Sequence, residues 1–375
     1  MRRVTLSLFF LVVGVEIGIL LDHFFLWRRP SPAAASAGVA GAAPEAPAPA
    51  APAAVACEAS ASFNGNRYPA RLLSLGSAYP EYARCLTVVV SNAPVGKTCE
   101  VRIESNLFEQ PLHYVATASS SKLELNPDLP WNYTVLRRVV QLRPELFVIS
   151  VAVNNRPAAQ STLTCMVHPV NEVVSRVFDA STGDWQDTSV CYAAFVNEDN
   201  PWINTLLQEA LARGGVQRFA GYEFGSQSVV QQVQAIWDTL AAKGLRYVDL
   251  ATMSGGVPEV TTQYVRFIGE SLRDQGANCV DASVLLASIF RRIGLRPVLL
   301  FKPGHCFVAV YDAADGGKLL AVETTMLSSA PFAAAMTYGD QELGTTLSNL
   351  NTPGYSSVDV ALARQEGVMP IGETP

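Results

Sequence analysis

Three residues in the last third of the chain carry the side chains of a nucleophile, a base and an orienting acid. Cys279 opens a long apolar run, His305 follows a Pro-Gly turn, and Glu323 comes near the end of the next β-rich run. A thiolate attacks a carbonyl carbon, an imidazole takes up and returns the proton, and a carboxylate holds the imidazole in place. Together they could perform acyl transfer through a thioester on Cys279.

The residues around Cys279 predict that it stands at the start of a helix. Asn278 is a capping residue, Asp281 falls in the first turn, and Arg291 and Arg292 lie in the last turn, so both ends suit the helix dipole. The unpaired amides and the positive end of the dipole favour thiolate over thiol and could stabilise an oxyanion. Asp281 is therefore interpreted as helix-start electrostatics.

A hairpin is predicted to bring the other two side chains together. The strand "HCFVAVY" is followed by the short loop "DAADG" and the strand "GKLLAVET". If Tyr311 pairs with Gly317, the register sets His305 directly opposite Glu323 on the same face, where opposed Cβ atoms are about 5 Å apart. This is the expected geometry of a base and its orienting carboxylate.

The order Cys, His, acid on a helix start and two successive strands resembles the transglutaminase-like superfamily of papain-type folds. The matching pieces are "NCVDASVLLASIFRRIGLRPV", "GHCFVAVY" and "VETT", within roughly the last 150 residues. The resemblance implies that Cys279 attacks, His305 activates it and protonates the leaving group, and Glu323 orients the ring. Glu323 stands where the superfamily usually has Asp, so its extra methylene must be absorbed by a shift of strand or ring.

More narrowly, "FVNEDNP", "QAIWDTL", "ANCVDASVLLASI" and "ETTML" resemble an uncharacterised bacterial group that joins an N-terminal β domain to this core. Superfamily members also place an upstream polar or aromatic side chain in the oxyanion hole. Gln263 and Gln275 are the two candidates here, and both stay open. The ordinary interpretations are a buried core thiol for Cys279 and a plain strand carboxylate for Glu323.

The N-terminal part predicts a membrane anchor and a spacer. Residues 1–29, "MRRVTLSLFFLVVGVEIGILLDHFFLWRR", are mostly apolar and about long enough to span a bilayer as a helix, although a cleaved signal peptide remains the alternative. Residues 30–56 are almost entirely Ala and Pro and predict an extended linker. We therefore expect a single-pass membrane protein whose folded domains are extracytoplasmic, in the periplasm.

The remaining chain predicts an α+β protein of two domains. Residues 57–190 contain short β-rich runs separated by turn signals, typical of an immunoglobulin-like all-β sandwich. Residues 191–375 form the expected transglutaminase-like domain, with helices over 200–215, 228–244 and 262–276 before the Cys279 helix, and short strands after it.

Composition narrows the function classes. The net charge of -6, with scattered Lys and Arg, argues against a nucleic-acid partner, and no phosphate-binding loop or zinc motif is present, so no cofactor or metal is expected. The resemblance implies a protein or peptide substrate and a peptidase, amidase or cross-linking reaction; the alternative is an inactive binding or scaffold module. Among seven cysteines, Cys85 with Cys99 and Cys165 with Cys191 are candidate disulfides.

Overall fold

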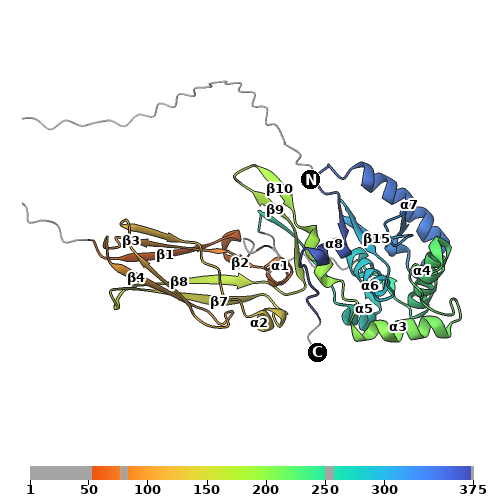
Figure 1. Ribbon diagram of the computed structural model, residues 1–375, viewed down its shortest axis with the longest axis horizontal. Coiled ribbons are helices and arrows are strands. Elements are labelled where there is room, and N and C mark those ends of the chain that lie inside the picture. The colour runs from red at the N-terminus through yellow and green to blue at the C-terminus, as the bar shows by residue number, and fades with distance from the viewer. Residues whose placement is uncertain (1–52, 77–78, 80–82, 250–256, 373–375) are drawn as a thin grey trace, which may run out of the picture. The chain divides into compact units, whose positions relative to one another are not determined.

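The chain folds as a mixed α+β structure with several β-sheets (Figure 1). A computed structural model describes residues 53–76, 79, 83–249 and 257–372. The predicted anchor, 1–29, and most of the predicted linker, 30–56, lie outside these residues. In the part of the chain that is described, no helix is long and apolar enough to cross a membrane. Ala53–Pro375 forms one compact unit.

Two sheets occupy the first half of this unit, drawn in orange to yellow-green in Figure 1. One has the order β1 (Ala56–Ala61), β3 (Leu86–Ser91) and β6 (Lys122–Leu125). The other has the order β2 (Asn66–Arg67), β8 (Arg156–Val167), β7 (Arg143–Val153), β4 (Thr98–Glu104) and β5 (Leu112–Thr117). Alternate residues from both sheets, including Val88, Val101 and Phe147, share one hydrophobic cluster. The short β-rich runs predicted for residues 57–190 are confirmed as strands.

Short helical elements complete this half. They are η1 (Phe63–Gly65), α1 (Pro69–Leu75) and α2 (Tyr133–Arg137). The helices of the second half are η3 (Ser189–Phe195), α3 (Pro201–Ala212), α4 (Gly225–Ala242), α5 (Ile268–Asp274), α6 (Cys279–Arg292), η4 (Thr324–Met326), α7 (Phe332–Ser348) and α8 (Val360–Gln365). The helices predicted near α3, α4 and α6 are confirmed, and Asn200 and Asn278 cap α3 and α6.

The helix predicted over 262–276 is wrong in its first part. Val260–Tyr264 forms strand β12, and α5 begins only at Ile268. Threonine and tyrosine at 261, 262 and 264 suit an extended backbone, and the Glu270 side chain caps the helix by accepting from the Phe267 amide at 2.8 Å. The 17-residue helix α7 was not predicted, because its small residues give a weak apolar stripe.

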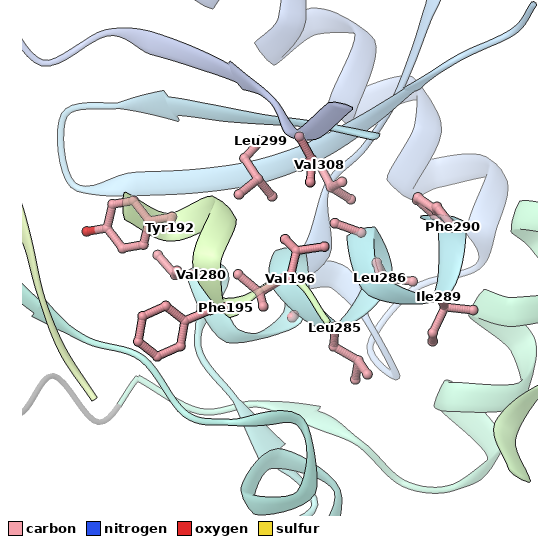
Figure 2. Close-up of a cluster of buried hydrophobic side chains, with 14 of the residues drawn as sticks. Tyr192, Phe195, Val196, Val280, Leu285, Leu286, Ile289, Phe290, Leu299 and Val308 are labelled. Atoms are coloured by element: carbon pink, nitrogen blue, oxygen red, sulfur yellow. The ribbon is translucent and has the colours of Figure 1, made fainter. Parts of the chain in front are cut away.

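A four-stranded antiparallel sheet forms the centre of the second half, in the order β16 (Leu319–Val322), β15 (His305–Tyr311), β14 (Pro297–Lys302) and β17 (Ser356–Asp359). Its two faces bury different residues of β15. Cys306 and Val308 belong to the cluster around α6, shown in Figure 2, whereas Phe307 and Ala309 pack in a separate cluster near Leu343 of α7. The sheet is thus covered by a helix on each face.

Helix α7 lies unusually close to the strand that leads to Glu323. A Cβ added at Gly339 would stand only 2.6 Å from the carbonyl oxygen of Ala321, so only glycine allows this approach. The Glu323 amide donates to the carbonyl oxygen of Ala335 at 3.1 Å. Contacts with α7 therefore fix the backbone at the end of β16.

A fourth sheet joins segments that are far apart in the sequence. β10 (Asp184–Asp187) pairs with β9 (Glu172–Asp179), and β9 also pairs with β12. The first two strands come from the segment predicted as the β domain, and β12 comes from the segment predicted as the second domain. A short parallel pair, β11 (Arg246–Tyr247) with β13 (Gly276–Ala277), leads into α6.

All seven cysteines are free thiols, so neither of the candidate disulfides is formed. Cys85, Cys99, Cys165, Cys191 and Cys306 are buried in the hydrophobic clusters. Cys279 and Cys57 are partly exposed, and of these two only Cys279 lines a cleft with a histidine.

Candidate active site

The hairpin that carries His305 has a different register from the predicted one. Tyr311 pairs with Leu319, not with Gly317, so every pair is displaced by two residues. The cause is the turn: the amide of Asp312 donates to the carbonyl oxygen of Lys318, and the amide of Lys318 donates to Oδ1 of Asp312. This closes the loop before β16 begins, and Gly317 lies inside it with φ 43°.

A two-residue displacement keeps His305 and Glu323 on the same face but makes them diagonal neighbours. Their side chains still meet, since Nε2 of His305 lies 2.8 Å from Oε2 of Glu323. Diagonal residues on neighbouring strands are farther apart than directly opposed ones. The extra methylene of glutamate makes the side chain long enough to cover this distance. The geometry gives a physical reason for glutamate at this position.

The Glu323 carboxylate is buried and fully engaged. Its Oε1 accepts from the Thr325 amide at 3.0 Å and from the Thr325 hydroxyl at 2.6 Å, while Oε2 faces His305. Burial would raise the pKa of this carboxyl group, but the hydrogen bonds from His305 and Thr325 and the charge of His305 lower it below its usual range. Glu323 is thus held as a carboxylate in one orientation.

His305 also contacts the thiol of Cys279. Burial would lower the pKa of the ring, but hydrogen bonds to Cys279 and Glu323, with the negative charges of both, raise it to about 9. Because Nε2 is engaged by Glu323, Nδ1 is the ring nitrogen left for Cys279. The arrangement favours a protonated ring beside the buried Glu323 carboxylate.

The first turn of α6 holds Cys279 in place. The Asn278 side chain accepts from the Asp281 amide at 2.9 Å, and Oδ2 of Asp281 accepts from the Asn278 amide at 3.0 Å. The Ala282 amide donates to the Asn278 carbonyl oxygen. The amides of Cys279 and Val280 have no acceptor within the helix, and both residues line the cleft.

A cleft of about 450 Å³ opens at Cys279 and His305. Residues from β9, β10, η3 and β12 line it, together with the start of α6, the turn between β14 and β15, and the loop before β17. Its lining from the β10-β9-β12 sheet is polar throughout: Ser175, Arg176, Asp187, Thr261, Thr262 and Gln263. Its volume lies in the ordinary range of clefts that bind a ligand.

The two oxyanion candidates lie in different surroundings. Gln263 lines the cleft with Cys279, and its Nε2 donates to the Tyr264 carbonyl oxygen at 3.2 Å. Gln275 ends α5 in the left-handed region, with φ 49°, and its Nε2 donates to the Lys243 carbonyl oxygen at 2.9 Å. Gln275 is not among the residues that line the cleft. The structure brings only Gln263 together with the nucleophile.

For three residues near the site, the sequence did not predict a role. Thr325 fixes Glu323, and Thr324 donates from its hydroxyl to the Cys279 carbonyl oxygen at 3.3 Å; a polar "ETT" directly after a strand was the available signal. Tyr247 pairs with Ala277 across β11 and β13. Burial raises the pKa of Tyr247, and the charges of Cys279, Asp249 and Glu323 raise it further.

The raised pKa of His305 predicts a pH-dependent contribution to stability. A ring whose pKa rises on folding, here from 6.5 to about 9, stabilises the fold fully below about pH 6.5 and loses this effect as the pH rises through 9. We expect the gap in unfolding free energy between wild type and His305→Gln to shrink by up to about 3 kcal/mol over that window. Urea denaturation across the window measures it; a gap that stays constant or widens contradicts the prediction.

No cluster of three or more metal-ligating side chains occurs within residues 53–76, 79, 83–249 and 257–372. In comparisons with known proteins, no family model matches the chain, and no curated protein matches it either.

Proposed function

We propose that this protein is a cysteine-dependent acyl-transfer enzyme that acts through a thioester on Cys279. The observation that supports it is the His305 ring, held by a buried Glu323 carboxylate and hydrogen-bonded to Cys279 at the start of α6. Cys279 and His305 also line one cleft together with Gln263. A structural cysteine needs neither the base nor the cleft.

The reaction follows from these positions. The Cys279 sulfur forms a bond to the carbonyl carbon, and the carbonyl oxygen becomes an oxyanion that the amides of Cys279 and Val280 and the Gln263 side chain stabilise. His305 donates its proton to the leaving amine as the C–N bond breaks. It then takes a proton from water or from an acceptor amine, which attacks the thioester and releases Cys279.

The reaction class is that of a peptidase, an amidase or a transglutaminase, and the substrate is a protein or peptide. In this proposal the α+β core is transglutaminase-like, and the preceding sheets are an immunoglobulin-like β-sandwich. Residues 1–29 anchor the protein in a membrane and residues 30–56 hold its folded part outside the cytoplasm. The support for the anchor is the apolar N-terminal sequence alone.

Alkylation of the thiols tests the proposal, and Cys57 supplies an internal control. Cys57 is also partly exposed, but burial and Glu58 raise its pKa. We expect iodoacetamide near pH 7 to modify Cys279 at least about tenfold faster than Cys57, as measured by peptide mass spectrometry over time. His305→Ala should remove most of that difference while leaving the rate at Cys57 unchanged.

A peptide amide substrate completes the test. An acyl adduct on Cys279, trapped by acid quench and absent from Cys279→Ala, supports turnover. If Cys279 reacts no faster than Cys57, the cleft belongs to an inactive module that binds a polypeptide without processing it.

A further inference from the structure

One cationic side chain in the cleft has no ion-pair partner among the described residues. Arg176 lies on β9, is half-buried and lines the same cleft as Cys279 and His305. Its guanidinium makes none of the ion pairs or hydrogen bonds found in residues 53–76, 79, 83–249 and 257–372. Its five N–H donors are therefore available to a ligand that enters the cleft.

An aromatic ring holds this guanidinium in place. The Cζ atom of Arg176 lies over the Trp185 ring, 5.2 Å from its centroid, and Trp185 packs against Phe178 with ring centroids 5.6 Å apart. A cation over a ring face is attracted without using a hydrogen-bond donor. The N–H groups of Arg176 therefore remain free for a planar anion, and the position of the side chain is already restricted.

Among the charged side chains nearby, Arg176 is the one whose guanidinium can bind an anion. Asp187 stands directly opposite Arg176 on β10, but the two form no ion pair and Oδ1 of Asp187 accepts from the Ser189 amide. Lys302, the other cation of the cleft apart from His305, is paired with Glu342. Thr261, which pairs with Arg176 across β12, is neutral and polar.

We propose that Arg176 binds a carboxylate of the polypeptide substrate, so that the cleft selects acidic segments. The inference rests on the proposed function, because the substrate is the one whose carbonyl Cys279 attacks. Arginine suits this task since its planar fork matches a carboxylate with two parallel hydrogen bonds. The carboxylate comes from an Asp or Glu side chain or from a chain terminus, and both present the same group.

Peptide probes with an electrophile on a central side chain test the selection. Each six-residue probe carries a chloroacetamide at its centre, and three forms are compared: Glu beside the centre with an amidated terminus, Gln there with an amidated terminus, and Gln there with a free terminal carboxylate. Labelling of Cys279 is followed by intact mass. We expect one carboxylate form to label about fivefold faster or more than the neutral form.

Matched variants assign the preference to Arg176. Arg176→Gln should bring the ratio of acidic to neutral labelling rates to about one, with Arg176→Lys in between because it keeps the charge without the fork. Arg218→Gln removes a similar guanidinium, 4.6 Å from the Phe224 ring centroid but away from the cleft, and should leave the ratio unchanged. Thermal unfolding checks that each variant is folded.

The outcomes separate the two proposals. A Glu preference assigns the subsite to an acidic side chain, and a preference for the free terminus assigns it to a chain end. Fast labelling by all three forms without a preference, or a preference that survives Arg176→Gln, overturns the carboxylate site and leaves the proposed function standing. Labelling of Cys279 at the rate of Cys57 by all forms overturns the proposed function, and this inference with it.

Discussion

Glu323→Gln is expected to slow the reaction of Cys279 with a peptide electrophile by about 10²- to 10³-fold, within the range of general acid–base effects. The substitution keeps the size of the side chain but not its acceptors. In the wild type, Oε1 of Glu323 accepts two hydrogen bonds from Thr325, and Oε2 faces Nε2 of His305. An amide must turn its NH₂ group toward one of these donors, so either the Thr325 contacts or the His305 contact is lost.

The control is the same substitution at Glu342, whose carboxylate pairs with Lys302. Glu342→Gln should change the labelling rate by less than about threefold, since its partner is not part of the Cys–His pair. The His305 pKa, followed by NMR titration, should fall in Glu323→Gln because a hydrogen bond and a negative charge that raise it are removed. If Glu323→Gln reacts at the wild-type rate, Glu323 is an ordinary buried carboxylate.

Asp281→Ala is expected to destabilise the fold by about 3 to 5 kcal/mol, the usual cost of removing one partner of a buried ion pair. Asp281 is buried, and its carboxylate accepts from the Arg266 amide at 2.8 Å, from Nη1 of Arg266 at 2.8 Å and from the Asn278 amide. Without it, a guanidinium and two amides lose their acceptor. Urea denaturation measures the loss.

Two further variants show that the cost comes from the unpaired partners. Burial raises the pKa of Asp281, although hydrogen bonds from Asn278 and Arg266 and the charge of Arg266 act against it. Asp281→Asn, which keeps an acceptor, should cost less than Asp281→Ala. The double variant with Arg266→Met should recover part of the loss, because no buried charge is then left unpaired. Equal stability of the Ala variant and wild type would contradict the role of this pair.

Local signals predicted the elements that carry the site. The helix start at Cys279 could be read from Asn278 and Asp281, and the hairpin from its Asp- and Gly-rich loop. The same face was predicted for His305 and Glu323 despite the wrong register, because an even displacement preserves the alternation of a strand. The exact pairing depended on a side chain in the turn, Asp312, which no periodicity reveals.

Long-range contacts were the part that the sequence did not reveal. β12 is five residues long and pairs with β9, far away in the chain, so neither strand signals the other. No sequence pattern identifies Arg266 as the partner of Asp281. From the sequence, Asp281 was interpreted only through its position in the first turn of a helix. Arg176 likewise became a candidate only when the cleft showed which side chains face Cys279.

The β10-β9-β12 sheet has a consequence for how this protein can be divided. One wall of the cleft depends on a strand that begins at Glu172, before the position where a border between the domains was expected. A chain starting at 191 would keep the nucleophile but expose the pairing edge of β12 and lack the guanidinium of Arg176. A truncated or recombined chain that keeps the proposed site must therefore include residues 172–187 together with the Cys279 helix.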